Sequence, residues 1–143
     1  MDRTHSSINS LLEQATCIAR RSKEAAGETE STEGYKRRQT EELIKFANDN
    51  GLWIDLSHLN ITYMDRGGEN EVFHDGNVSV VKLNNFEYAG DDLENFFIRI
   101  AAHNKFFGNV PYQMIDFAYN SQQEFCAVLV QPRSEERRVG KEC

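Results

Sequence analysis

The chain has 143 residues, a hydrophobic content of 39% and a formal net charge of -7, which allows one domain or part of one with a core of its own. The acidic balance argues against a general surface for nucleic acid or anionic membranes, and no apolar run approaches the roughly 20 residues of a membrane-spanning helix. The N-terminus lacks the apolar core of a secretory signal, and three cysteines without metal-ligand spacing suit a reducing compartment. We therefore expect a cytoplasmic protein.

Apolar residues recur at helical spacing between Ser7 and Ala26 and predict a first helix. Residues 27–34 are polar and acidic, so they are interpreted as a linker. Since this linker separates the helix from the rest of the chain, we expect the helix to pack poorly or to serve an absent partner. The predicted division is a helix and linker over residues 1–34, followed by a domain over residues 35–132.

A second helix is predicted from about Lys36 to Asn48, because apolar residues again fall on one side. Asn50 and Gly51 supply a left-handed stop at its C-terminal end. Trp53 follows in a short apolar stretch, where we interpret it as an anchor in the core.

The stretch from Met64 to Asn85 predicts a β-hairpin preceded by a glycine turn. Gly67 and Gly68 form the turn, and an Asp-Gly pair at residues 75–76 separates two β-rich runs. A short strand over residues 61–63 leads into this region.

Lys82 is the residue in the hairpin that suggests a function. Because side chains alternate along a strand, Val78, Val80 and Lys82 share one face. A lysine within a valine run is costly unless its ammonium has an anionic partner, and the two glycines would let backbone N–H groups approach the same anion. The pattern indicates a phosphate-holding hairpin. On local pattern alone, the alternative is an edge-strand lysine whose ammonium reaches solvent.

A third helix is predicted after Asp91 and Asp92, because acidic residues favour a helix N-terminus. Glu94 lies at the border of its apolar face, where it is either a partner for a group on the sheet or a solvated carboxylate. Two further strands follow over residues 112–119 and 125–130, and Cys126 is interpreted as a small buried hydrophobe. The predicted fold class is α+β, with a five-stranded antiparallel sheet and one packed helix, preceded by N-terminal helices.

Residues 133–143 break abruptly from the apolar strand that precedes them. Their sequence, RSEERRVGKEC, resembles the in-frame translation of a common sequencing adapter. We therefore exclude this tail from the reasoning about the fold and expect the natural reading frame to have been cut after Pro132. The alternative is a solvated, charged C-terminus or an arginine-rich binding tail.

From about Glu42 to Pro132, the chain resembles the kinase-like domain of bacterial polyvalent proteins, which are multidomain products of conjugative elements and phages. The resemblance rests on four stretches, which are Asn50–Asp55, Gly67–Val72, Val80–Asn84, and His103–Phe107 together with Val130–Pro132. The part covered corresponds to the N-terminal lobe of a kinase.

This resemblance implies ATP as the ligand. Lys82 would contact the α- and β-phosphates, and Glu94 would be the helix partner that holds Lys82 in place. Gly67 and Gly68 would form the loop over the phosphates. Val72 and Val80 would form the roof of the adenine pocket, and residues 130–132 would be the hinge between the lobes.

The chain departs from the kinase pattern in two respects. Only the pair Gly67-Gly68 stands for the usual Gly-x-Gly-x-x-Gly loop, with Glu71 where a third glycine would fall. The sequence also has no His-Arg-Asp and no Asp-Phe-Gly motif, which supply the base and the magnesium ligands. We therefore expect no phosphate transfer by this chain alone, no metal site in it, and Mg²⁺ only together with a missing C-terminal lobe.

Two functions remain open at this point. The first is the nucleotide-binding lobe of a kinase that phosphorylates hydroxyl groups of proteins or small molecules. The second is a non-catalytic interaction or scaffold module of a mobile-element protein. The expected partners are a nucleotide and the C-terminal lobe, with no membrane and no direct binding of nucleic acid.

Overall fold

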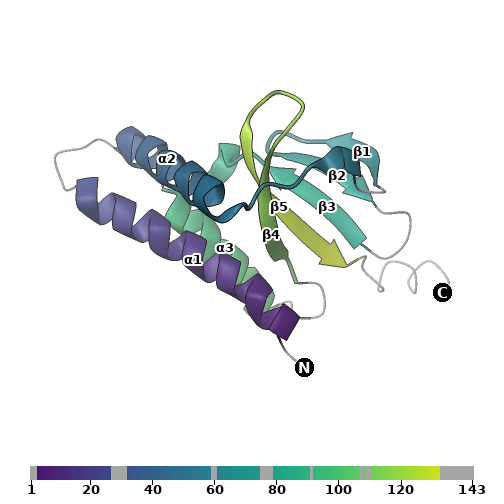
Figure 1. Ribbon diagram of the computed structural model, residues 1–143, viewed down its shortest axis with the longest axis horizontal. Coiled ribbons are helices and arrows are strands. Elements are labelled where there is room, and N and C mark those ends of the chain that lie inside the picture. The colour runs from purple at the N-terminus through teal and green to yellow at the C-terminus, as the bar shows by residue number, and fades with distance from the viewer. Residues whose placement is uncertain are drawn as a thin grey trace.

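The computed structural model describes residues 3–26, 32–58, 61–74, 79–90, 92–106, 108 and 111–132. Within these ranges the fold is α+β (Figure 1). The helices are α1 (Arg3–Ala26), α2 (Thr32–Asn50) and α3 (Leu93–Phe106), with short 3-10 helices η1 (Leu56–His58) and η2 (Glu87–Ala89). The strands are β1 (Thr62–Arg66), β2 (Asn70–His74), β3 (Ser79–Asn84), β4 (Gln113–Tyr119) and β5 (Phe125–Pro132).

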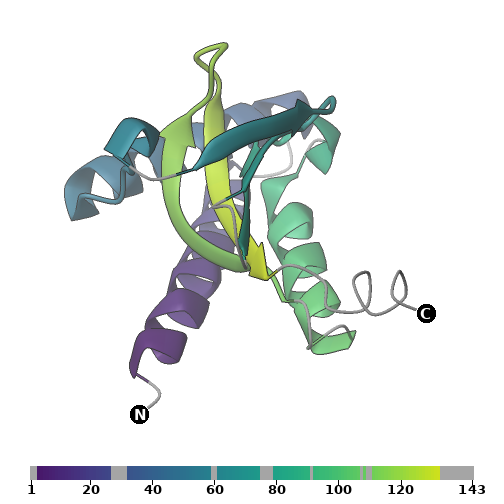
Figure 2. The ribbon, with the colours of Figure 1, turned by 90° about the vertical axis from the view of Figure 1, so that its right-hand side faces the viewer.

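The five described strands form one antiparallel sheet in the order β1-β2-β3-β5-β4. The sheet is strongly twisted, so that β1 and β2 lie across the direction of β4 and β5 (Figure 2). The predicted fold class and the predicted hairpin of β2 and β3 are confirmed. The Asp-Gly turn at residues 75–76, to which the hairpin was attributed, lies outside the described residues.

The edge of the sheet at β4 is covered by the segment that follows α2. The N–H of Ile54 donates to the carbonyl of Phe117 over 3.0 Å, and the N–H of Phe117 donates to the carbonyl of Leu52 over 2.8 Å. Between them, Trp53 stacks on Tyr119 with ring centroids 5.1 Å apart and packs against the core, as predicted. This segment therefore joins the helices to the sheet through main-chain bonds.

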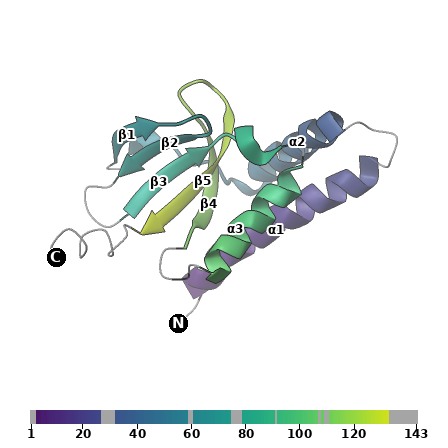
Figure 3. The same ribbon diagram turned by 180° about the vertical axis from the view of Figure 1, so that it is seen from behind.

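Helix α1 is an integral part of the fold. It packs beside α2 and α3 and against β4 (Figures 1 and 3). Its buried positions, Leu11, Leu12, Ala15 and Ala19, recur at helical spacing, and the two alanines have no exposed surface. The expectation that this helix packs poorly is wrong. Of the predicted linker, residues 27–31 lie outside the described ranges, and Thr32 already belongs to α2.

The core has two parts, one on each face of the sheet. The larger cluster lies between the helices and the sheet, and Phe97, Phe117 and Leu43 are its largest fully buried members. The smaller cluster lies on the other face and is formed by Val81, Leu83, Ala118, Cys126 and Val128. Cys126 is buried as predicted, and burial raises the pKa of its thiol to about 12, so it is a packing residue and not a reactive thiol.

The buried side chain of Gln39 connects the three helices. Its amide nitrogen donates to the carbonyl of Ala19 in α1 over 3.0 Å and to the carboxylate of Asp92 over 2.8 Å. Its amide oxygen accepts the N–H of Leu93, the first residue of α3, over 2.8 Å. Each polar atom of this amide group therefore has a partner, and the start of α3 is fixed relative to α1 and α2. No helix in the described part of the chain is long and apolar enough to cross a membrane.

Candidate functional site

The glycine turn joins β1 to β2 and is closed by hydrogen bonds. The N–H of Gly67 donates to the carbonyl of Asn70 over 2.9 Å, and the N–H of Asn85 donates to the carbonyl of Glu69 over 2.8 Å. A Cβ added at Gly67 would meet no atom within 4 Å, and the φ angle of this residue lies outside the left-handed region. The fold itself therefore does not require glycine at position 67.

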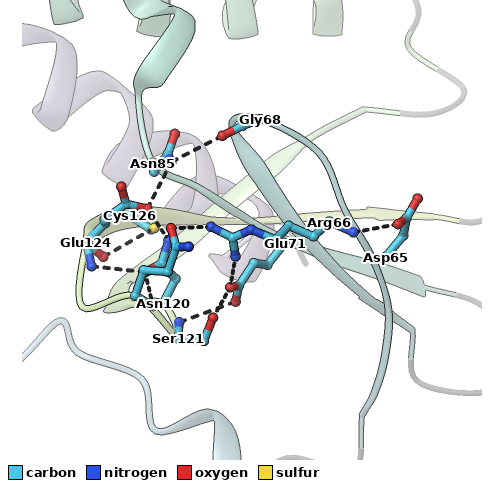
Figure 4. Close-up of polar contacts among 10 residues, drawn as sticks. Asp65, Arg66, Gly68, Glu71, Asn85, Asn120, Ser121, Glu124 and Cys126 are labelled. Carbon is cyan, nitrogen blue, oxygen red and sulfur yellow. Dashed lines mark hydrogen bonds and ion pairs between the residues drawn. The ribbon is translucent and has the colours of Figure 1, made fainter.

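A polar cluster fixes the glycine turn against the turn between β4 and β5 (Figure 4). The carboxylate of Glu71, only 3% exposed, accepts hydrogen bonds from the guanidinium of Arg66 and the hydroxyl of Ser121. The amide of Asn85 adds bonds to Glu124 over 3.0 Å and to the carbonyl of Gly68 over 3.4 Å. The turn is therefore held from both of its sides.

Lys82 lies near the middle of β3. As predicted, it lies on the same face of the sheet as Val80. In the register of the sheet, Lys82 stands opposite Val72 of β2 and opposite Leu129 of β5. Val80 precedes it by two residues and shares its face. Glu71, which stands opposite Leu83, belongs to the other face. The carboxylate at the position of the expected third glycine therefore points away from Lys82.

A cavity of about 320 Å³ lies beside Lys82, between the glycine turn, the sheet and α3. This volume is at the lower end of the range for small-molecule sites. The cavity is lined by Glu69, Asn70, Lys82, Asn84, Phe96, Arg99, Ile100, Tyr112 and Leu129. Of the predicted site residues, Lys82 is in this lining, whereas Gly67, Gly68, Val72, Val80 and Glu94 are not.

The ammonium of Lys82 contacts Tyr112. Its Nζ donates to the Tyr112 hydroxyl over 2.9 Å and lies 5.0 Å from the centre of the tyrosine ring. No carboxylate of the described residues forms an ion pair with Lys82. Among the described residues, the charge of Lys82 is therefore not paired with a carboxylate.

The predicted ion pair between Lys82 and Glu94 is not formed, and this expectation is corrected. Glu94 lies in the first turn of α3, where its carboxylate accepts from Arg20 over 2.8 Å and from Lys23 over 2.9 Å. Lys23 also bonds Asp92 over 2.7 Å. Both cations come from α1, the helix that the sequence places before the predicted domain of residues 35–132. The docking of α1 therefore gives Glu94 other partners.

These contacts lower the pKa values of both carboxyl groups. Burial favours the neutral form of Asp92, but hydrogen bonds from Gln39 and Lys23 outweigh burial, and its pKa lies below the usual value. Burial likewise opposes ionisation of Glu94, and the bonds from Lys23 and Arg20 again lower its pKa overall. The ionised forms are thus stabilised by folding.

The variant Glu94→Gln should respond less to acid than the unaltered chain. Because the pKa of Glu94 is lower in the folded than in the unfolded state, its contribution to stability is present above the unfolded-state pKa of about 4. It is lost as the pH falls through the folded-state pKa. Urea unfolding near neutral pH and at about pH 3 measures the difference. An equal loss of unfolding free energy in both proteins would contradict this assignment.

Sequence reasoning missed the cavity residues Tyr112, Arg99, Asn70 and Asn84. Asn70 and Asn84 stand opposite each other in β2 and β3, and the Asn84 amide donates to Asn70 over 2.9 Å. The alternation in β3 places Asn84 on the face of Lys82, and this was the signal that could have found it. Tyr112 was predicted to begin a strand, but it precedes β4, which starts at Gln113, so alternation along a strand does not place its side chain. In the described ranges, no group of His, Cys, Asp and Glu side chains could hold a metal ion.

The arrangement defines the class of the protein. An antiparallel sheet in the order β1-β2-β3-β5-β4, one helix between β3 and β4, and a lysine in the third strand form a kinase-like N-terminal lobe, here preceded by two helices. A model of the serine/threonine/tyrosine kinases found in polyvalent proteins matches residues 36–142, and the chain belongs to this family. No curated protein and no solved structure matches the chain.

The family match also bears on the C-terminal tail. It extends beyond Pro132 into the segment that resembles a translated adapter. Residues 133–143 lie outside the described ranges, so the origin of this segment stays a prediction.

Proposed function

We propose that residues 35–132 are the ATP-binding lobe of a polyvalent-protein kinase. Lys82 contacts the α- and β-phosphates, Gly67 and Gly68 cover the phosphates, and Val72 and Val80 form the roof over the adenine. The observation that carries this proposal is Lys82, a half-buried residue that lines a cavity beside the glycine turn and whose ammonium has no described carboxylate partner.

The charges around the cavity support a polyphosphate ligand. Arg99 of α3 lines the same cavity as Lys82, so that two cations from different elements flank one space. The side-chain amides of Asn70 and Asn84 add hydrogen-bonding groups on the wall formed by the sheet. Charge-assisted hydrogen bonds to phosphate oxygens are among the stronger polar interactions in proteins. Glu69, which follows the glycine pair and also lines the cavity, would repel a phosphate placed next to it.

The proposal places the catalytic groups elsewhere. The sequence contains no His-Arg-Asp and no Asp-Phe-Gly motif, and these motifs supply the base and the Mg²⁺ ligands of protein kinases. We therefore assign ATP binding to this lobe and assign the transfer of phosphate and the binding of Mg²⁺ to a C-terminal lobe outside this chain.

Replacing Lys82 by alanine should weaken ATP binding by roughly tenfold or more, because a hydrogen bond to a charged group contributes about 1.5–3 kcal/mol. Isothermal titration of the full chain with ATP measures this change. Lys45→Ala is the matched control, since Lys45 is an exposed lysine of α2 that pairs with Asp49 over 3.4 Å. ATP affinity that is the same with and without Lys82 would refute the role of this lysine.

The variant Gly67→Ala distinguishes an effect on ATP binding from an effect on the stability of the fold. An added Cβ meets open space, so the melting temperature should stay the same, while a methyl group on the turn should weaken ATP binding if the backbone approaches the phosphates closely. Unchanged ATP affinity would mean that Gly67 has no part in the site.

A scaffold function is the second candidate. The observation that favours it is the edge strand β1, on which Tyr63 and Met64 are exposed. An open edge with apolar side chains can accept a further strand from a partner. ATP binding that depends on Lys82 would favour the kinase function over this one.

A further inference from the structure

Tyr112 is the described residue that holds the ammonium of Lys82. The hydroxyl accepts a hydrogen bond from Nζ over 2.9 Å, and the ring lies 5.0 Å from the same nitrogen. Both contacts are favourable, because the hydroxyl oxygen is an acceptor and the face of an aromatic ring attracts cations. Together they restrict a long side chain that otherwise has four rotatable bonds.

Tyr112 is itself fixed by α3. The side chain of Asn104 accepts the main-chain N–H of Tyr112 over 2.7 Å and donates to its main-chain carbonyl over 2.8 Å. The ring of His103 lies 4.8 Å from the ring of Tyr112. The backbone of Tyr112 is therefore bonded to the last part of α3, and its ring reaches from there to β3.

We propose that Tyr112 is the positioning residue of Lys82 and takes the place of the helix carboxylate. This inference rests on the proposed function, because it assumes that Lys82 binds phosphate. Glu94 is bound to Arg20 and Lys23 of α1, and the residues of α3 that line the cavity are Phe96, Arg99 and Ile100, none of them acidic. The link from α3 to Lys82 thus passes through Asn104 and Tyr112.

A neutral partner has a different electrostatic effect from a carboxylate. A carboxylate orients the lysine and also cancels its charge, whereas a phenol orients the lysine and leaves the charge available. With Tyr112 as the partner, the full positive charge of Lys82 attracts the phosphates of the nucleotide. The tyrosine should therefore affect the binding of ATP and not that of adenosine.

A double-mutant cycle tests the inference. In the full chain, Tyr112→Phe keeps the ring and removes the hydroxyl, so ATP affinity should fall by about fivefold while adenosine affinity stays the same. In the Lys82→Ala background, the same substitution should have no effect on ATP affinity, because the group that the hydroxyl positions is absent. Tyr119→Phe, at an exposed tyrosine on the far part of β4, is the matched control. Side-chain NMR relaxation of Lys82 should show increased motion in Tyr112→Phe without any ligand.

The outcomes separate the two proposals. An equal loss of ATP affinity in both backgrounds would show a structural effect of Tyr112 and would overturn the inference while Lys82 keeps its role. Unchanged or raised affinity in Tyr112→Phe, or unchanged motion of Lys82, would also overturn the inference alone. If the unaltered chain binds no ATP, the proposed function fails, and the positioning role for nucleotide fails with it.

Discussion

Replacing Ala19 by aspartate should destabilise the chain by about 3 kcal/mol or more, which is a large part of the stability of a typical domain. Ala19 is fully buried where α1 meets the rest of the fold, and its carbonyl already accepts the amide of Gln39. A carboxylate at this position would be removed from water, and Lys23, four residues further along α1, is already paired with Asp92 and Glu94. We expect the melting temperature to fall sharply and cooperatively for the whole chain, because α1 shares one core with α3 and β4.

Cys17→Asp is the matched control for this substitution. Cys17 is exposed on the same helix two residues away, so an aspartate there should change the unfolding free energy by no more than about 0.5 kcal/mol. Circular dichroism and tryptophan fluorescence follow the helices and the region of Trp53 separately. If Ala19→Asp melted only the helical signal and left Trp53 in its native environment, α1 would be a dispensable addition to the lobe.

Replacing Gln39 by leucine should cost about 2–4 kcal/mol, although the new side chain is apolar and similar in size. The substitution leaves the N–H of Leu93 without its acceptor and removes a donor from the carboxylate of Asp92. Both groups lie at the start of α3 and have little access to water. The penalty for an unsatisfied buried polar group therefore exceeds the gain from burying the leucine side chain.

Urea unfolding of Gln39→Leu, compared with that of Gln14→Leu, measures this effect. Gln14 is an exposed glutamine of α1 that donates to Ser10 over 2.8 Å, so its replacement should be nearly neutral. A Gln39→Leu variant as stable as the unaltered chain would show that the three helices do not need this hydrogen-bonded junction.

The order of the elements could be predicted because it depends on local patterns. The alternation in β3 placed Lys82 and Val80 on one face, and the strand pairing confirms this arrangement. The apolar spacing of α3 was also visible in the sequence: Leu93, Phe96 and Phe97 recur at helical spacing and are buried, although Ala101 on the same face is exposed. Such patterns report the environment of one element and need no knowledge of what covers it.

The contacts of the site could not be predicted in the same way. Glu94 is paired with Arg20, which is 74 positions away in the chain, and Lys82 with Tyr112, which is 30 positions away. Which of several cations reaches a given carboxylate depends on how the helices pack. The polar composition of residues 27–34 predicts a separating linker, and it gives no sign that α1 packs against the domain that follows. In the structure, α1 and α2, which precede and follow this stretch in the chain, pack beside each other (Figure 1).

The polar cluster around Glu71 has a consequence for the energetics of binding at the glycine turn. A flexible loop that closes over a ligand loses conformational entropy at that moment, and this loss weakens the observed affinity. Here the hydrogen bonds of Glu71 with Arg66 and Ser121 are already formed without any ligand. A nucleotide would bind to a preorganised turn. The conformational entropy of the turn would already have been lost during folding, so its loss would not weaken the observed affinity.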